Sequence, residues 1–168
     1  MTTLDRLNKL TSTEFVEELK DLFEHSPWIV EGTVADRPFF DGEAFYTALV
    51  EVLDATPVEA KVELIKAHPD LAGKLAVAGE LTDFSAEEQQ SARLDQLTAE
   101  QFKYISALNE RYRERFGFPF VICVKEQTQE SIFEHFAKRV ENERSVEIEA
   151  ALTQIKRIAW HRLQSVLG

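Results

Sequence analysis

Apolar residues recur at intervals of three and four along most of this 168-residue sequence. That period matches one face of an α-helix, so it predicts an all-α fold. Helix-start patterns agree with it, because Thr56-Pro57-Val58-Glu59 and Thr98-Ala99-Glu100-Gln101 have the form of capping boxes. We expect helices over residues 11–23, 42–53, 56–68, 98–116, 128–140 and 145–167, with another that starts at Ser85.

Two stretches fall outside this pattern. Residues 69–84 are expected to form an irregular connection with one helical turn near residues 71–75. Residues 116–124 are the one strand-like run, and because no second run exists to pair with it, we interpret it as buried extended chain. The prediction is a single domain over residues 1–168, a bundle of six or more helices with one short extended segment.

Charge and cysteine content exclude several classes of protein. Nineteen Lys and Arg stand against 30 Asp and Glu, for a net charge of −11, so we expect neither nucleic acid nor an anionic membrane as a partner. Cys123 is the only cysteine, which leaves no intrachain disulfide and no cysteine-based zinc site. Neither a signal peptide nor an apolar run of ~18 residues is present, so we expect a cytoplasmic protein.

The first candidate for chemistry is His68, which stands directly before Pro69 at the expected end of a helix. The proline restricts the backbone of its predecessor. Histidine is the usual general acid or base near neutral pH. The alternative is a surface or helix-capping histidine that interacts favourably with the helix dipole.

Ser85, Glu88 and Gln89 form the second candidate. The pattern Ser-x-x-Glu is most simply a capping box. A helix N-terminus also presents free N–H groups that suit a carboxylate ligand. In a third arrangement, Glu88 faces His68 and raises the pKa of the imidazole by charge pairing.

Arg162 lies on the apolar face that Ile155, Ile158 and Ala159 mark in the last helix. A cation there must form an ion pair or bind an anion, unless it snorkels to solvent. The buried run of residues 116–124 poses a related problem, because its backbone N–H and C=O groups need partners. A ligand with amide-like edges would supply some of them; side chains and water are the alternative.

Five motifs, in their order and spacing, resemble those of the 2-oxo-4-hydroxy-4-carboxy-5-ureidoimidazoline (OHCU) decarboxylase family. They are His68-Pro69-Asp70-Leu71-Ala72-Gly73, Leu81-Thr82 with Ser85-x-x-Glu88-Gln89, Leu108-Asn109-x-x-Tyr112, Phe116-Gly117-Phe118-Pro119-Phe120, and Ile158-Ala159-x-x-Arg162-Leu163. The likeness also touches Ser26-Pro27-Trp28 and Arg37-Pro38-Phe39, so it covers most of the chain. It departs at Arg93, where the family usually has a glycine.

The resemblance implies a helical enzyme, often a homodimer, that needs no metal or organic cofactor. Its small-molecule substrate is OHCU, which it decarboxylates to (S)-allantoin in the last step of urate-to-allantoin conversion. The resemblance implies His68 as the catalytic acid or base and Glu88 as its catalytic partner. The substrate-binding residues that it implies are Pro69, Ser85, Ala86, Glu87, Glu88, Gln89, Phe120, Val121, Ile122, Cys123, Val124 and Arg162.

Two other functions stay open at this point. His68-Pro69-Asp70 is also the signature tripeptide of J-domain co-chaperones, but there the preceding helix is strongly basic. Here Lys61 and Lys66 are balanced by two glutamates in the same helix. A helical interaction module without chemistry is the second alternative, and it would leave Arg162 on an apolar face without a reason.

Overall fold

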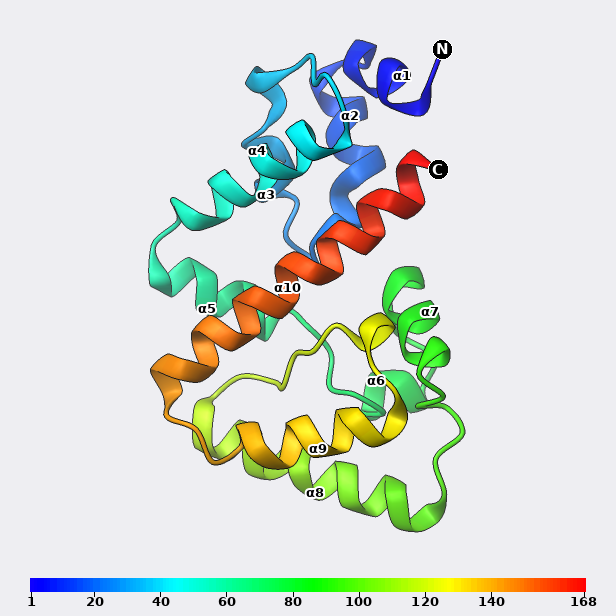
Figure 1. The fold of residues 1–168 in the computed structure, drawn as a ribbon, viewed down its shortest axis with the longest axis vertical. Coiled ribbons are helices and arrows are strands. Elements are labelled where there is room, and N and C mark those ends of the chain that lie inside the picture. Colours follow the sequence, from blue (N-terminus) through cyan, green and yellow to red (C-terminus); the bar gives the residue numbers. More distant parts are fainter. The chain divides into compact units, whose positions relative to one another are not determined.

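The computed structural model describes residues 1–168 and contains ten α-helices, three 3₁₀ helices and no β-strand (Figure 1). The all-α prediction is therefore confirmed. The chain divides into two compact units. The first unit comprises Met1–Ala67 and Lys156–Gly168, and the second comprises His68–Ile155. That residues 1–168 behave as a single domain stays a prediction.

The first unit is built from short helices and the end of the last helix. Its elements are α1 (Thr3–Lys9), α2 (Ser12–Leu19), η1 (Lys20–Leu22), α3 (Trp28–Glu31), η2 (Val34–Asp36), α4 (Gly42–Asp54), α5 (Val58–Lys66) and residues 156–167 of α10 (Arg144–Leu167). Phe45 packs on Phe15 and stacks on Phe39, with ring centroids 5.6 and 4.6 Å apart. Arg37 lies over the Phe15 ring and donates hydrogen bonds to the Leu7 and Leu10 carbonyls. The loop before α4 is thereby fastened to the core.

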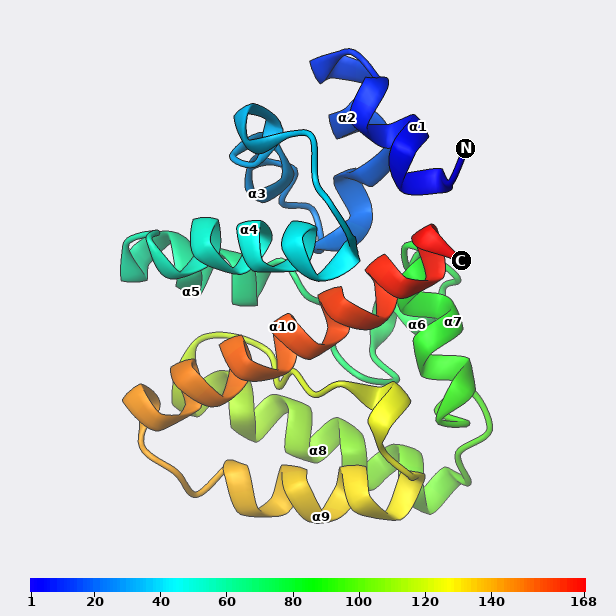
Figure 2. The same cartoon turned by 45° about the horizontal axis from the view of Figure 1, so that its top comes forward.

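The second unit is continuous in sequence. Its elements are α6 (Lys74–Val77), α7 (Asp83–Ser91), α8 (Ala99–Phe116), η3 (Val124–Glu126), α9 (Gln129–Arg139) and residues 144–155 of α10. Helices α8 and α9 lie side by side in both ribbon views (Figures 1 and 2). Thr98 and Thr128 cap them as predicted, and Gly117 ends α8 in the left-handed conformation at φ 80°. Helix α7 packs against η3.

Residues 118–124 leave α8 without forming a strand, and every side chain from Phe120 to Val124 is buried. The prediction of buried chain that forms no strand is confirmed for residues 118–123, whereas Phe116 ends α8 and Val124 begins η3. Aromatic rings enclose the start of this segment, because Tyr112 contacts four phenylalanine rings at centroid distances between 4.5 and 6.0 Å: Phe116, Phe118, Phe120 and Phe136. The apolar area that these rings remove from water stabilises the second unit.

A fully buried carboxylate lies beside this aromatic group. Glu147 is 0% exposed and accepts three hydrogen bonds: from the Tyr112 hydroxyl at 2.6 Å, from Arg139 Nε at 2.9 Å and from Asn142 Nδ2 at 3.0 Å. We call these four residues the Glu147 cluster. Burying a carboxylate is costly unless it is paired and hydrogen-bonded, and here it is both.

Two predicted capping boxes are wrong. Pro57 occupies the cap position of α5, and the Thr56 hydroxyl donates instead to the Val52 carbonyl, four residues earlier, at 2.8 Å. Helix α7 is capped by Thr82, whose hydroxyl oxygen accepts from the Ser85 N–H at 3.3 Å. Helix α7 thus starts two residues before Ser85, which lies within its first turn.

Other element boundaries also differ from expectation. Helices α1 and α3 were not predicted, and the helical turn expected near residues 71–75 is α6, which begins at Lys74. Helix α5 ends at Lys66, so His68 follows the helix rather than ending it. Helix α10 begins at Arg144, which places Ser145 inside its first turn instead of at its cap. These shifts are small because a helix end depends on a few local hydrogen bonds.

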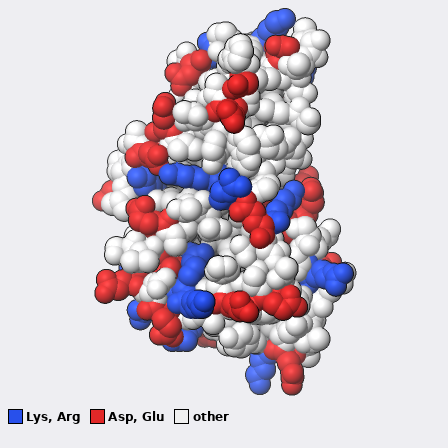
Figure 3. All heavy atoms as spheres, in the orientation of Figure 1, with Lys and Arg blue, Asp and Glu red and all other residues white.

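Acidic and basic side chains are interspersed on the face that Figure 3 shows. The protein has exposed ion pairs, among them Arg6 with Glu18 and Lys156 with Asp54. Such exposed pairs each contribute ~0–1 kcal/mol to stability. None of the helices is both long enough and apolar enough to cross a membrane.

The Glu147 cluster leads to a prediction about pH. Burial, and next the hydrogen bond to Glu147, raise the pKa of Tyr112 above its ordinary value. The protonated phenol makes its full contribution to the free energy of unfolding when the pH is below the pKa of an unfolded tyrosine, about 10. That contribution is lost as the pH rises further. In an absorbance titration at alkaline pH, Tyr112→Phe should shrink the tyrosinate signal of the protein unfolded in guanidinium but leave that of the native protein unchanged. An equal loss in both states would show that Tyr112 ionises normally.

Arg93 has a backbone conformation that suits glycine. It lies just after α7 at φ 58°, and the N–H groups of Arg93 and Leu94 donate to the Gln90 and Gln89 carbonyls. This is the Schellman arrangement, which places a left-handed residue after the helix and is usually occupied by glycine. The glycine that the family usually has at this position therefore has a structural reason.

Arg93→Gly should raise the free energy of unfolding by about 1 kcal/mol, because a Cβ atom is strained in the left-handed region. Chemical denaturation measures the change. Arg93→Ala is the matched control, since it removes the same charge and keeps the Cβ atom. A gain of equal size in both variants would assign the effect to charge and not to the backbone.

Candidate functional site

His68 lies in the loop that connects α5 to α6, and its side chain is 5% exposed. A surface histidine, the alternative raised from the sequence, is therefore excluded. The C-terminus of α5 ends at the Ala67 cap, whose N–H bonds back to the Glu63 and Leu64 carbonyls. His68 and Pro69 then begin a non-helical stretch that carries the imidazole into the interior.

Two side-chain amides hold the loop that follows His68. Gln89 accepts from the Ala72 N–H at 2.9 Å and donates to the Asp70 carbonyl at 3.2 Å. Asn109 of α8 donates to the Leu71 carbonyl at 2.9 Å. Both amides are buried, so each replaces bonds that water cannot provide. We call Gln89 and Asn109 the loop anchors, because together they fix three consecutive residues after Pro69.

The predicted residues on α7 divide between two faces. Ser85, Glu88 and Gln89 are buried, as residues three and four apart on one helix face. Ala86 is half-buried, whereas Glu87 is exposed and pairs with Lys125 at 3.4 Å. The buried face thus presents a hydroxyl, a carboxylate and an amide in the unit that also holds His68.

The segment from Phe120 to Val124 is fixed by side chains on the backbone of two of its residues. Arg139 donates to the Val121 carbonyl at 2.8 Å, and Gln154 accepts from the Cys123 N–H at 3.0 Å. The Cys123 and Val124 carbonyls accept from residues of η3 and just beyond it. The N–H and C=O of Ile122 have no hydrogen-bond partner in the protein, although Ile122 is 4% exposed. An amide-like ligand would satisfy both groups.

Arg162 lies in the first unit and is 2% exposed. Its Nη2 pairs with Glu24 at 2.9 Å, and Glu24 is equally buried. Its Nη1 donates to the Asp21 carbonyl at 2.9 Å. The ion pair that was one alternative from the sequence is therefore present, and snorkelling is excluded. The two charges compensate one another away from solvent.

Three residues that matter here, Glu24, Asn109 and Glu147, were not predicted from the sequence. Glu24 stands in a loop with no motif around it, so nothing in the sequence marks it as the partner of Arg162. Asn109 was part of a quoted motif but received no role. Glu147 has no local pattern, because its partners Tyr112 and Arg139 lie 35 and 8 residues away.

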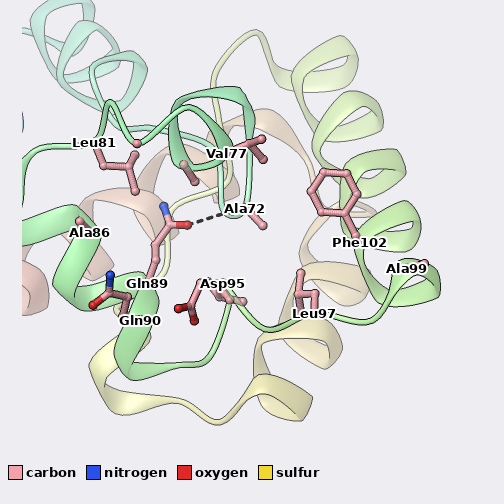
Figure 4. Close-up of a pocket in the computed structure, with 13 residues that line it drawn as sticks. Ala72, Val77, Leu81, Ala86, Gln89, Gln90, Asp95, Leu97, Ala99 and Phe102 are labelled. Carbon is pink, nitrogen blue, oxygen red and sulfur yellow. Dashed lines mark hydrogen bonds between the residues drawn. The ribbon is translucent and has the colours of Figure 1, made fainter.

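A cavity of about 580 Å³ adjoins the anchored loop inside the second unit. Figure 4 shows Gln89 extending toward Ala72 on one wall, with Phe102 of α8 opposite and Gln90 and Asp95 at another side. Most of the lining is apolar. The cavity thus shares Ala72, Ala86 and Gln89 with the predicted site region, while His68 and Glu88 are absent from its walls.

Comparison with known proteins adds independent information. The family model described as OHCU decarboxylase matches residues 8–164. The OHCU decarboxylase of Haloferax volcanii is 38% identical over 161 residues, which is 96% of this chain and 94% of that protein. The uric acid degradation bifunctional protein of Bacillus subtilis is 36% identical over 167 residues, or 99% of this chain, and the chain spans only 33% of that longer protein.

Solved structures agree with these matches. A crystal structure of (S)-allantoin synthase is 26% identical with a TM-score of 0.80, covering 100% of this chain and 54% of its own. An OHCU decarboxylase solved in the presence of (S)-allantoin has a TM-score of 0.73 at 24% identity over 90% of this chain and 97% of its own, and it shares the fold. With a family model matched from residue 8 to residue 164, this chain belongs to the OHCU decarboxylase family.

Proposed function

We propose that this chain decarboxylates OHCU to (S)-allantoin, with His68 as the acid or base. The observation that carries the proposal is the buried imidazole on a loop held by Gln89 and Asn109, in a chain that matches the family nearly throughout. A buried histidine on an anchored loop, in the same unit as the buried carboxylate of Glu88, suits proton transfer. The relatives named for this reaction support the substrate.

The name of the substrate defines the chemistry. When the bond from C4 to its carboxylate breaks, the electron pair forms a C4=C5 double bond, and the C5=N pair moves to the ring nitrogen, which takes a proton. The C4 hydroxyl then loses its proton while C5 gains one, which gives allantoin and CO₂. The substrate supplies its own electron sink, so the protein has only to bind, orient and move protons.

The residues of the second unit suit those tasks. His68 delivers the proton to the ring nitrogen or to C5, with Glu88 as its proposed catalytic partner. The free N–H and C=O of Ile122 pair with the amide-like edge of the ring or ureido group. Protonation of C5 from one face then gives a single enantiomer. Pro69, Ser85, Ala86, Glu87, Gln89 and the rest of Phe120 to Val124 complete the proposed binding surface.

Arg162 is proposed as the residue that binds the substrate carboxylate or ring oxygens. Its bonds to Glu24 and to the Asp21 carbonyl fix the plane of the guanidinium before substrate arrives. A pre-oriented guanidinium loses less entropy when it binds an anion than a mobile one. Glu24 is thus proposed as the residue that orients Arg162.

Other functions receive less support. The J-domain alternative rests on the tripeptide at His68 alone, whereas the family match runs through residues 8–164. A binding module without chemistry gives no reason for an imidazole buried on an anchored loop. A cytoplasmic location stays a prediction.

His68→Asn should lower kcat by at least a hundredfold and change KM little, because general acid–base catalysis contributes roughly 10²–10⁴ in rate. The measurement generates OHCU from urate with urate oxidase and hydroxyisourate hydrolase and follows circular dichroism in the near ultraviolet. The wild-type protein should give a lasting (S)-allantoin signal. The variant should approach the spontaneous decay, which ends in racemic allantoin.

His135→Asn is the matched control, since His135 is an exposed histidine on α9. It should retain wild-type kcat and KM. Near-normal turnover in His68→Asn would remove the role of this imidazole but leave the decarboxylase activity in place. Failure of the wild-type protein to exceed the spontaneous rate would contradict the proposed function itself.

We further propose that the chain forms a homodimer. Val77 is 72% exposed and Phe102 is 42% exposed, and both line the same cavity, so an apolar surface remains in contact with water. Covering it with a second copy would remove that area from solvent. Analytical ultracentrifugation should give about twice the 19.2 kDa chain mass, and Val77→Glu should shift the protein toward monomer. A wild-type monomer at micromolar concentration would contradict this assembly.

A further inference from the structure

We propose that Arg139 is a positioning residue that holds the Phe120–Val124 backbone in register for the substrate. This inference rests on the proposed function and concerns a side chain outside the predicted site. Arg139 lies at the end of α9 and its side chain is 11% exposed. It donates to the backbone of the segment and also pairs with the buried carboxylate of Glu147. No other arginine of the second unit combines these two contacts.

The guanidinium makes three contacts at once. Nη1 donates to the Val121 carbonyl at 2.8 Å, and Nε donates to Glu147 at 2.9 Å. The plane lies over the Phe120 ring with its central carbon 4.4 Å from the ring centroid. Phe120 in turn stacks on Phe136 with a centroid distance of 4.0 Å. One planar group thus fixes the ring of residue 120 and the carbonyl of residue 121 together.

Glu147 makes this geometry rigid. Its other hydrogen bonds, from Tyr112 and Asn142, come from α8 and from the turn between α9 and α10. The carboxylate therefore cannot follow a displaced guanidinium without breaking bonds to two other parts of the unit. A lysine at position 139 would keep the charge but has no planar fork to bridge Glu147 and Val121 simultaneously.

The direction of the contact explains why it concerns the substrate. In extended chain, residues two apart direct their backbone groups to the same side, and the residue between them directs its groups to the other. Val121 is bound by Arg139 and Cys123 by Gln154, so both face α9 and α10. Ile122 then directs its free N–H and C=O away from those helices, where a ligand edge can pair with them.

Arg139→Lys tests the proposal without leaving Glu147 as a lone buried charge. We expect kcat/KM to fall about ten- to a hundredfold, because small displacements of a binding group have effects of that size. The enantiomeric excess of the allantoin should also fall, measured by circular dichroism at an enzyme concentration that keeps the catalysed rate well above the spontaneous one. Gln154→Leu, which removes the hydrogen bond to the Cys123 N–H and no charge, should likewise lower both kcat/KM and the enantiomeric excess.

Arg144→Lys is the matched control. Arg144 donates to the Phe116 carbonyl at 3.1 Å and lies 5.4 Å from the Phe118 ring centroid, so it makes the same two types of contact just before the segment. It should retain kcat/KM within twofold and full enantiomeric excess. Both arginine variants should be compared at equal folded fraction, determined by far-ultraviolet circular dichroism.

Hydrogen–deuterium exchange supplies a readout that needs no activity. Amides of residues 118–124 should exchange faster in Arg139→Lys than in wild type, with α9 unchanged.

If exchange rises while kcat/KM and enantiomeric excess stay at wild-type values, the segment does not position substrate and the proposal is overturned. Lower activity with unchanged exchange and full enantiomeric excess also overturns it. If the wild-type protein forms no (S)-allantoin, the proposed function fails and the positioning role falls with it, while exchange still decides whether Arg139 holds the segment.

Discussion

Buried backbone that is neither helix nor strand must still satisfy its N–H and C=O groups, and the second unit depends on how that requirement is met. The loop after His68 and the segment from Phe120 to Val124 both enter the interior without a ladder of their own. Side chains replace the ladder: Gln89 and Asn109 bind the loop, and Arg139 and Gln154 bind the segment. The helices that supply these four side chains therefore serve as supports for non-helical backbone.

This arrangement separates positioning from chemistry. Gln89 commits both ends of its amide to the loop, so its first effect on any reaction is through the placement of His68. Asn109 also binds the loop from α8, through its Nδ2 group alone. Ile122 is the reverse case, because its neighbours are held and its own backbone groups remain available. The backbone groups that can bind a ligand are those that the supporting side chains leave without a hydrogen bond.

Local signals explain what the sequence could predict. Thr98, Thr128 and Gly117 act within a few residues of themselves, so the helices that they bound were found. The same local rules failed where two caps compete, because Thr82 and Ser85 both precede a plausible helix and only the packed structure selects Thr82. The buried chain of residues 118–123, within the predicted run of residues 116–124, was recognisable from its composition and the lack of a pairing partner.

Partners distant in sequence could not be predicted. Arg162 was expected to need a counter-charge, but thirty acidic residues were available and Glu24 has no distinguishing context. Glu147 likewise becomes visible only when the chain brings Tyr112, Arg139 and Asn142 to it. In each case the sequence indicates that a buried polar group requires a partner, and three-dimensional packing decides which one.

The pairing of Glu24 with Arg162 also has a consequence for synthesis on the ribosome. The first unit needs residues from both ends of the chain, whereas the second is one uninterrupted stretch. Chains emerge from the N-terminus, and contacts between distant residues form late. The ion pair between Glu24 and Arg162 therefore cannot form until α10 has been made. The second unit can therefore complete its native contacts before the first unit does, although translation begins with the first unit. The first unit is completed only when the end of α10 has been made.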